Sequence, residues 1–247
     1  MLYLDCFAGI SGDMFLGACL DLGVDFSGFQ SELKKLPVSG WELQVEKKLQ
    51  QGITGTHCGV DLSVSNHEKI HSEEEEHHHR TCGDILKLID KSELSKSVKQ
   101  HASSMFCRLA EAEGKIHGVM REEVKFHEVG ALDSIIDIIG AAVCMELLEE
   151  KGFYVSDVNV GSGYIYCAHG WLPVPAPATL EILCASGIRI YSRFAKTETV
   201  TPTGAAILAE YAVQQTGEIK MCPCKVGYGL GTRKLEIPNA LRMVQFS

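Results

Sequence analysis

The sequence predicts an α/β fold, a layered sheet with helices packed on it, and its first residues carry the clearest signal. Residues 2–6 form a short apolar run typical of a buried strand. A loop of glycine and serine at 7–13 follows, and residues 14–22 then place apolar side chains at helical spacing until Gly23. A strand, a tight loop and a helix in this order are how an α/β unit begins.

Strand-like and helix-like segments alternate along the rest of the chain. Apolar and polar residues alternate at 41–49 and 59–64, which predicts strands. Further strands are expected at 155–160, 164–167 and 241–246, with a glycine-rich stretch at 225–233. Helical spacing predicts helices at 29–36, 83–89, 95–114, 130–150, 180–185 and 202–214. The 247 residues are expected to form one domain.

Composition excludes several classes of protein. The formal charge of −9 disfavours binding to nucleic acid, and no apolar run reaches the length of a membrane span. The N-terminus lacks the pattern of a secretory signal, so we expect a cytoplasmic location. The ten cysteines are scattered, which indicates reduced thiols rather than a disulfide framework.

The first candidate site is the loop before the first predicted helix. Gly9 and Gly12 let the backbone approach a ligand closely, and free amides at the helix start hold anions. Ser11 is a donor to a phosphate, while Asp5 and Asp13 are acceptors for a cation. An ordinary tight turn, with Ser11 or Asp13 capping the helix, explains the same residues.

The second candidate site precedes and opens the long apolar helix near residue 130. Asp133 and Asp137 are four residues apart and therefore share one helix face. Burying two carboxylates is costly unless a metal ion, a lysine or a substrate lies beside them. His127 and Glu128 lie just before this helix and are candidates for the same site. The alternative is that the aspartates face water at the positive end of the helix dipole.

Two further segments place polar groups at helix starts. His169 stands before three alternating prolines, which impose a stiff extended segment that leads into a helix. Thr201 fits a helix cap, Pro202 fits the first helical position, and Thr203 and Gly204 are positioned to meet a phosphate. A lone structural histidine and an ordinary cap remain open alternatives.

A histidine- and glutamate-rich loop is expected at about 65–80. Because this segment has no hydrophobic face that could pack against the core, we expect it to be disordered. Imidazole suits nickel, zinc and copper, so the loop is a candidate for weak metal storage or delivery, or else a tolerated polar insertion. Its histidines are His67, His71, His77, His78 and His79.

Taken together, segments 4–5, 9–14, 127–137, 169–178 and 201–205 resemble the LarC family, the nickel insertion proteins of nickel-pincer cofactor biosynthesis. The resemblance implies insertion of nickel into pyridinium bisthiocarboxylic acid mononucleotide, with one carbon–nickel and two sulfur–nickel bonds formed and CTP consumed. It also implies that the product serves lactate racemase and related enzymes, and that the activity is that of a lyase-class cyclometallase.

The resemblance also implies roles and partners. It makes residues 1–247 an N-terminal domain whose C-terminal partner, associated with CTP and a divalent metal, is absent from this chain and acts in cis or in trans. His127 or Glu128 is the first candidate for the base that removes a ring proton, and His169 is the second. Two alternatives stay open, a non-catalytic nickel chaperone or storage module and a nucleotide phosphohydrolase. The state of assembly, including a homo-oligomer, stays open as well.

Overall fold

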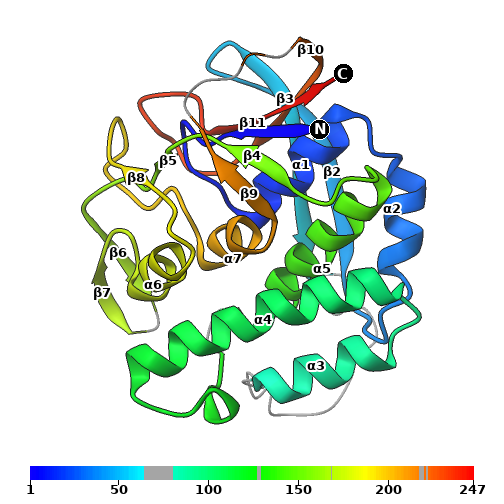
Figure 1. Ribbon diagram of the computed structural model, residues 1–247, viewed down its shortest axis with the longest axis vertical. Coiled ribbons are helices and arrows are strands. Elements are labelled where there is room, and N and C mark those ends of the chain that lie inside the picture. The colour runs from blue at the N-terminus through cyan, green and yellow to red at the C-terminus, as the bar shows by residue number, and fades with distance from the viewer. Residues whose placement is uncertain (64–79, 127–128, 168, 217–219, 221) are drawn as a thin grey trace.

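The computed structural model describes residues 1–63, 80–126, 129–167, 169–216, 220 and 222–247. Within them, the chain forms a mixed seven-stranded sheet in the order β2-β3-β10-β11-β1-β4-β9. Its strands are β1 (Leu2–Asp5), β2 (Glu42–Gln50), β3 (Ile53–Asp61), β4 (Phe153–Val155), β9 (Ala212–Gln215), β10 (Pro223–Leu230) and β11 (Ala240–Phe246). Strand β1 runs parallel to β4 and antiparallel to β11, so the two ends of the chain lie side by side (Figure 1).

The helices are stacked on one side of this sheet (Figure 1). Helix α1 packs directly on β3, β10 and β11, and α4 crosses beneath α5, α6 and α7. The α/β fold predicted from the sequence is therefore confirmed. The helices are α1 (Gly12–Leu22), α2 (Phe26–Leu33), α3 (Cys82–Lys91), α4 (Lys96–His117), α5 (Leu132–Leu147), α6 (Pro177–Ala185) and α7 (Pro202–Tyr211), with a short 3-10 turn at Arg121–Glu123.

Two small sheets lie outside the main one. Strand β5 (Val158–Asn159) pairs with β8 (Ile190–Tyr191), and β6 (Tyr164–Cys167) forms a hairpin with β7 (Gly170–Pro173). The hairpin leads through Ala176 into α6, whose first residue is Pro177. No helix in the described part of the chain combines the length and apolar character needed to cross a membrane.

The core lies between the sheet and α1, α5 and α7. Leu2 and Leu4 of β1 are fully buried, as are Phe15 of α1 and Ile139 of α5. Removing such side chains from water is the main favourable contribution to folding. This core fixes the helix starts that form the site described below.

The glycine-rich stretch at 225–233 contains strand β10, and its glycines have a packing role. A Cβ atom on Gly229 would stand 1.7 Å from the Met14 carbonyl oxygen, and one on Gly227 would stand 2.5 Å from that of Ala18. Helix α1 can lie this close to the strand only because both positions lack a side chain.

In three places, strand pairing changes the predicted elements. The helix expected at 202–214 ends at Tyr211, because residues 212–215 pair with β4 as strand β9. The strand expected at 155–160 is split between β4 and β5, which belong to different sheets. The strand expected at 59–64 begins earlier, at Ile53, where it pairs with β2 across a tight turn. In each case, pairing with a distant or neighbouring strand overrides the local pattern.

Candidate active site

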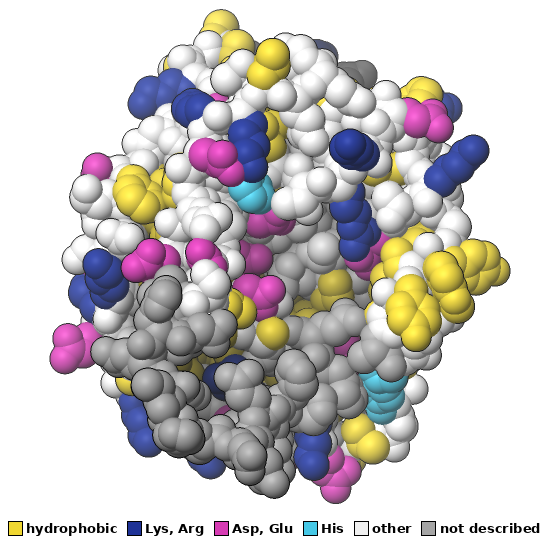
Figure 2. Space-filling view, turned by 180° about the vertical axis from the view of Figure 1, so that it is seen from behind, with side chains coloured by type: hydrophobic (Ala, Val, Ile, Leu, Met, Phe, Trp, Pro, Cys, Tyr) yellow, Lys and Arg dark blue, Asp and Glu magenta, His cyan; other side chains and the backbone are white. Residues whose placement is uncertain are grey.

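The starts of α1, α5 and α7 meet around one cavity of about 400 Å³. This face of the molecule is hollowed, and Asp and Glu side chains gather around the hollow (Figure 2). A volume of this size is in the range of small-molecule sites. The cavity is lined by Ser11, Gly12, Asp13, His57, Gly59, Val60, Val129, Asp133, Ser134, Asp137, Glu198, Thr201, Pro202, Thr203, Thr232 and Arg233.

Glycines allow these helix starts to approach one another. A Cβ atom on Gly12 would stand 2.4 Å from an Asp137 carboxylate oxygen, and one on Gly204 would stand 2.2 Å from the Ile10 carbonyl oxygen. Gly9 has a φ of +84°, and a Cβ there would meet the Thr199 carbonyl oxygen at 2.0 Å. All three had been predicted to bind a cofactor. The structure gives each of them a packing role beside the cavity, and contact with a ligand stays a prediction.

One wall of the cavity is acidic. The Ser11 hydroxyl donates to Asp13, and burial raises the pKa of Asp13 despite this hydrogen bond. Burial, together with the negative charges of Asp13 and Asp133, holds the pKa of Asp137 well above its usual range. Asp133 and Asp137 both line the cavity, as their spacing on one helix face predicted. A cation placed here would relieve the repulsion among the three carboxylates.

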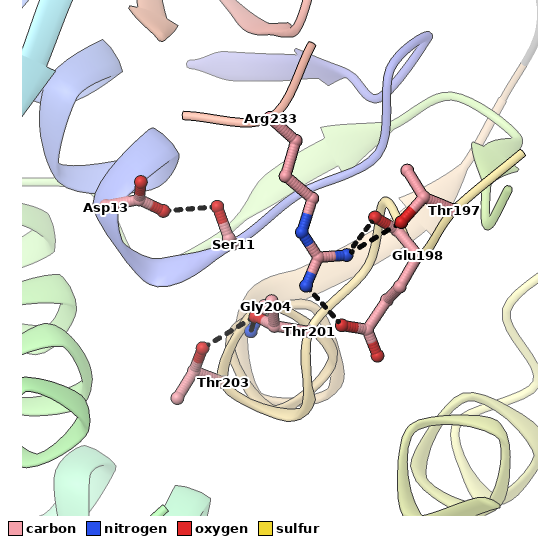
Figure 3. A network of polar contacts seen from close by, with 8 residues as sticks. All are labelled: Ser11, Asp13, Thr197, Glu198, Thr201, Thr203, Gly204 and Arg233. Carbon is pink, nitrogen blue, oxygen red and sulfur yellow. Dashed lines mark hydrogen bonds and ion pairs between the residues drawn. The ribbon is translucent and has the colours of Figure 1, made fainter. Parts of the chain in front are cut away.

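A second part of the lining, called the donor wall, carries the hydroxyl groups at the start of α7 and the guanidinium of Arg233 (Figure 3). The Thr201 hydroxyl caps α7 by accepting from the Gly204 amide at 3.2 Å, and it lies 2.7 Å from the Thr203 hydroxyl. Arg233 donates to the backbone carbonyl of Glu198 at 2.6 Å and to its carboxylate at 3.2 Å. The predicted cap at Thr201 is confirmed. Donors of this kind at a helix start suit a phosphate.

The other predicted site residues lie elsewhere. His169 lines a neighbouring cavity that shares Glu198 and Pro202 with this one. Asp5 pairs with Arg242 at the end of β1 and does not line the cavity. The remaining candidates lie outside the described residues, namely His127, Glu128 and the five histidines His67, His71, His77, His78 and His79.

The cavity is also lined by residues that the sequence did not predict, among them His57, Glu198, Thr232 and Arg233. His57 belongs to β3 and Arg233 follows β10, and the two strands become neighbours only in the folded sheet. No local pattern marks them. In the described part of the chain, no three His, Cys, Asp or Glu side chains are arranged to hold a metal ion together.

Comparison with known proteins identifies the family. The family model described as nickel insertion protein matches residues 2–246. This chain belongs to the nickel insertion protein family. The nickel insertion family had been predicted from the order of the sequence motifs, and that prediction is confirmed. No solved structure matches the chain significantly.

Several members of the nickel insertion family are closely similar to this chain. The proteins of Clostridium kluyveri and Akkermansia muciniphila are 49% and 47% identical to it, and each alignment covers 98% of the chain. The protein of Acetivibrio thermocellus is 44% identical over 99% of the chain. All three are named pyridinium-3,5-bisthiocarboxylic acid mononucleotide nickel insertion protein. The alignments cover 61%, 59% and 60% of these relatives, so the chain spans about three fifths of their length.

Proposed function

We propose that this chain carries the site at which nickel enters pyridinium-3,5-bisthiocarboxylic acid mononucleotide, the compound in the names of its relatives. One observation carries the proposal. Three helix starts enclose a cavity that is lined both by carboxylates and by hydroxyl and guanidinium donors. The proposed reactants need both kinds of wall, because the nickel ion and pyridinium ring are cationic and the phosphate is anionic.

The donor wall binds the nucleotide phosphate in this proposal. Thr203 and Arg233 supply side-chain donors, and Ser11 joins them if its hydroxyl turns from Asp13 to the phosphate. The first amides of α1 and α7 add the positive ends of two helix dipoles. The predicted contact of Gly12 would be made by its backbone, whereas those of Gly9 and Gly204 require their amides to exchange the Cys6 carbonyl and the Thr201 hydroxyl for the phosphate. Binding through the phosphate fixes the position of the ring in the cavity.

The acidic wall receives the nickel ion as a substrate. Asp13, Asp133 and Asp137 offer hard oxygen ligands, which hold nickel less strongly than the two thiocarboxylates of the nucleotide do. Nickel therefore leaves the carboxylates for sulfur. As the ring carbon–hydrogen bond breaks, its electron pair forms the carbon–nickel bond and its proton passes to a base. His127 or Glu128 remains our first candidate for that base and His169 the second.

The complete reaction is proposed to need CTP, a divalent metal and a C-terminal domain supplied in cis or in trans, and to belong to the lyase class. All ten cysteines are free thiols, which supports the proposed cytoplasmic location. We propose no partner among nucleic acids or membranes and leave homo-oligomers open.

Mass spectrometry tests the proposal directly. The chain is incubated with nickel and the mononucleotide, with and without CTP and the separate C-terminal domain of a relative. A nucleotide that has gained nickel and lost protons is the expected product, and Asp133→Asn or Asp137→Asn should abolish it. Wild-type product yields from both variants would remove this cavity from the reaction. Nickel binding with no product under any condition would favour the chaperone alternative.

A further inference from the structure

A second cavity, also of about 400 Å³, adjoins the first beside strands β2, β3 and β10. His57 and Thr232 line both cavities, so the two spaces meet at these side chains. Thr232 directly precedes Arg233 of the donor wall. His57 is close to Asp13 of the acidic wall, because burial raises the pKa of Asp13 and the positive charge of a protonated His57 acts in the opposite direction. The junction of the two cavities therefore connects the donor wall with the acidic wall.

The imidazole of His57 is held in a fixed orientation at this junction. Its Nδ1 lies 3.1 Å from the Leu230 carbonyl oxygen of β10. Because a carbonyl oxygen can only accept, Nδ1 carries the proton, and Nε2 of the neutral ring is left as an acceptor. No hydrogen bond joins Nε2 to another group in the described part of the chain.

The position of Gly59 shows where this acceptor lies. Gly59 follows His57 by two residues on β3, so both belong to the same face of the strand. A Cβ atom on Gly59 would stand 3.3 Å from His57 Nε2, and Gly59 lines the first cavity. The unpaired nitrogen is therefore at the edge of the cavity in which we place the nucleotide. A partly buried acceptor without a partner is a place where a ligand can donate.

The ribose of a mononucleotide supplies such a donor at the right place. The ribose joins the phosphate to the ring, so a nucleotide bound by its phosphate at Arg233, with its ring near Asp13, carries its ribose between the two walls. Each ribose hydroxyl can donate a hydrogen bond to Nε2. A ligand without that hydroxyl leaves the acceptor unpaired, and a site built around a hydroxyl discriminates against such ligands.

We infer that the junction of the two cavities is a ribose subsite, in which His57 Nε2 accepts a hydrogen bond from a ribose hydroxyl of the nucleotide. The placement of the phosphate and the ring rests on the proposed function. The subsite makes the cavity selective for a ribonucleotide over the corresponding deoxyribonucleotide. It gives His57 a positioning role that is separate from nickel transfer and from removal of the ring proton.

Calorimetry with nicotinic acid mononucleotide and its 2′-deoxy and 3′-deoxy forms tests the inference in the absence of nickel. The wild type should bind at least one deoxy form roughly threefold to tenfold more weakly than the ribonucleotide, the value of one hydrogen bond. In His57→Ala the ratio of these Kd values should fall close to one. Because the ratio compares two ligands on the same protein, a change in stability does not imitate this result.

A second variant leaves the imidazole in place. Gly59→Ala puts a methyl group 3.3 Å from Nε2 and should also lower the ratio. His101→Ala is the matched control, because His101 bonds to Glu210 and does not line the cavity, and it should keep the wild-type ratio. Equal Kd values of the three ligands for the wild type, or an unchanged ratio in His57→Ala, would overturn the ribose subsite and leave the proposed function standing. Failure of the wild type to bind any of the three would count against both.

Discussion

Asp137 is the residue whose environment most opposes its charge. It lies among the apolar residues of α5 and beside Asp13 and Asp133, and its pKa is raised well above the ordinary value of 3.8. The folded chain therefore disfavours the ionised carboxylate. This cost is absent at pH values below 3.8, grows as the pH rises towards the raised folded pKa, and is constant above it.

Replacing Asp137 with Asn should consequently stabilise the chain at pH 7 by on the order of 1 kcal/mol, although nickel insertion is lost. The gain should shrink as the pH falls towards 3.8. Urea unfolding at a series of pH values measures it. Asp90→Asn on the exposed surface of α3 is the control and should change the free energy of unfolding by less than about 0.5 kcal/mol. A loss of stability in Asp137→Asn at pH 7 would instead show that interactions in the folded chain compensate the charge of the Asp137 carboxylate.

Arg233 supplies the guanidinium of the donor wall, and its contribution to phosphate binding can be measured by itself. Nicotinic acid mononucleotide is a suitable probe of phosphate binding, because it has a pyridinium ring, a ribose and a phosphate in common with the proposed substrate. Arg233→Ala alone would also break the ion pair with the buried Glu198, so the informative variant is Arg233→Ala with Glu198→Gln. Its Kd should rise roughly tenfold to a hundredfold, the value of a charge-assisted hydrogen bond.

Glu198→Gln alone serves as the control for that double variant, and calorimetry should find its Kd close to that of the wild type. Equal Kd values for all three proteins would mean that Arg233 only supports Glu198 and does not bind the phosphate.

At the scale of elements, the contact between α1 and β10 positions the first helix start. Gly229→Ala would put a Cβ atom 1.7 Å from the Met14 carbonyl oxygen, so helix and strand must separate. Overpacking of this kind costs about 1–3 kcal/mol. Gly83→Ala in α3 is the matched control, since its nearest contact is the Thr81 hydroxyl at 3.7 Å. Thermal unfolding should show a lower melting temperature for Gly229→Ala and an equal or slightly higher one for Gly83→Ala. Equal melting temperatures would contradict this account of the contact.

The elements also explain how far the sequence could predict the site. The starts of α1, α5 and α7 were predictable because their signals are local: glycines, a Thr-Pro pair and aspartates at helical spacing. Asp133 and Asp137 share a face for the same local reason. His57 and Arg233 were not predictable, because they reach the cavity through the parallel pairing of β3 with β10, more than 150 residues later in the chain. Strand order of this kind depends on tertiary packing, which local patterns do not record.

At the scale of the whole molecule, the reactivity of the ten cysteine thiols depends on how the chain packs around them. Cys184, Cys222 and Cys224 are exposed, Cys107 and Cys167 are partly buried, and the other five are buried. Among those five, burial raises the pKa of Cys6, Cys58 and Cys144, and it raises that of Cys82 to about 11. Because the thiolate is the reactive form, a thiol reagent should modify three cysteines quickly in the native chain, Cys107 and Cys167 more slowly, and the buried five only on unfolding.

Titration of thiols with a chromogenic disulfide tests this order. In denaturant without reductant all ten should react, and fewer than ten would reveal a disulfide that the structure lacks.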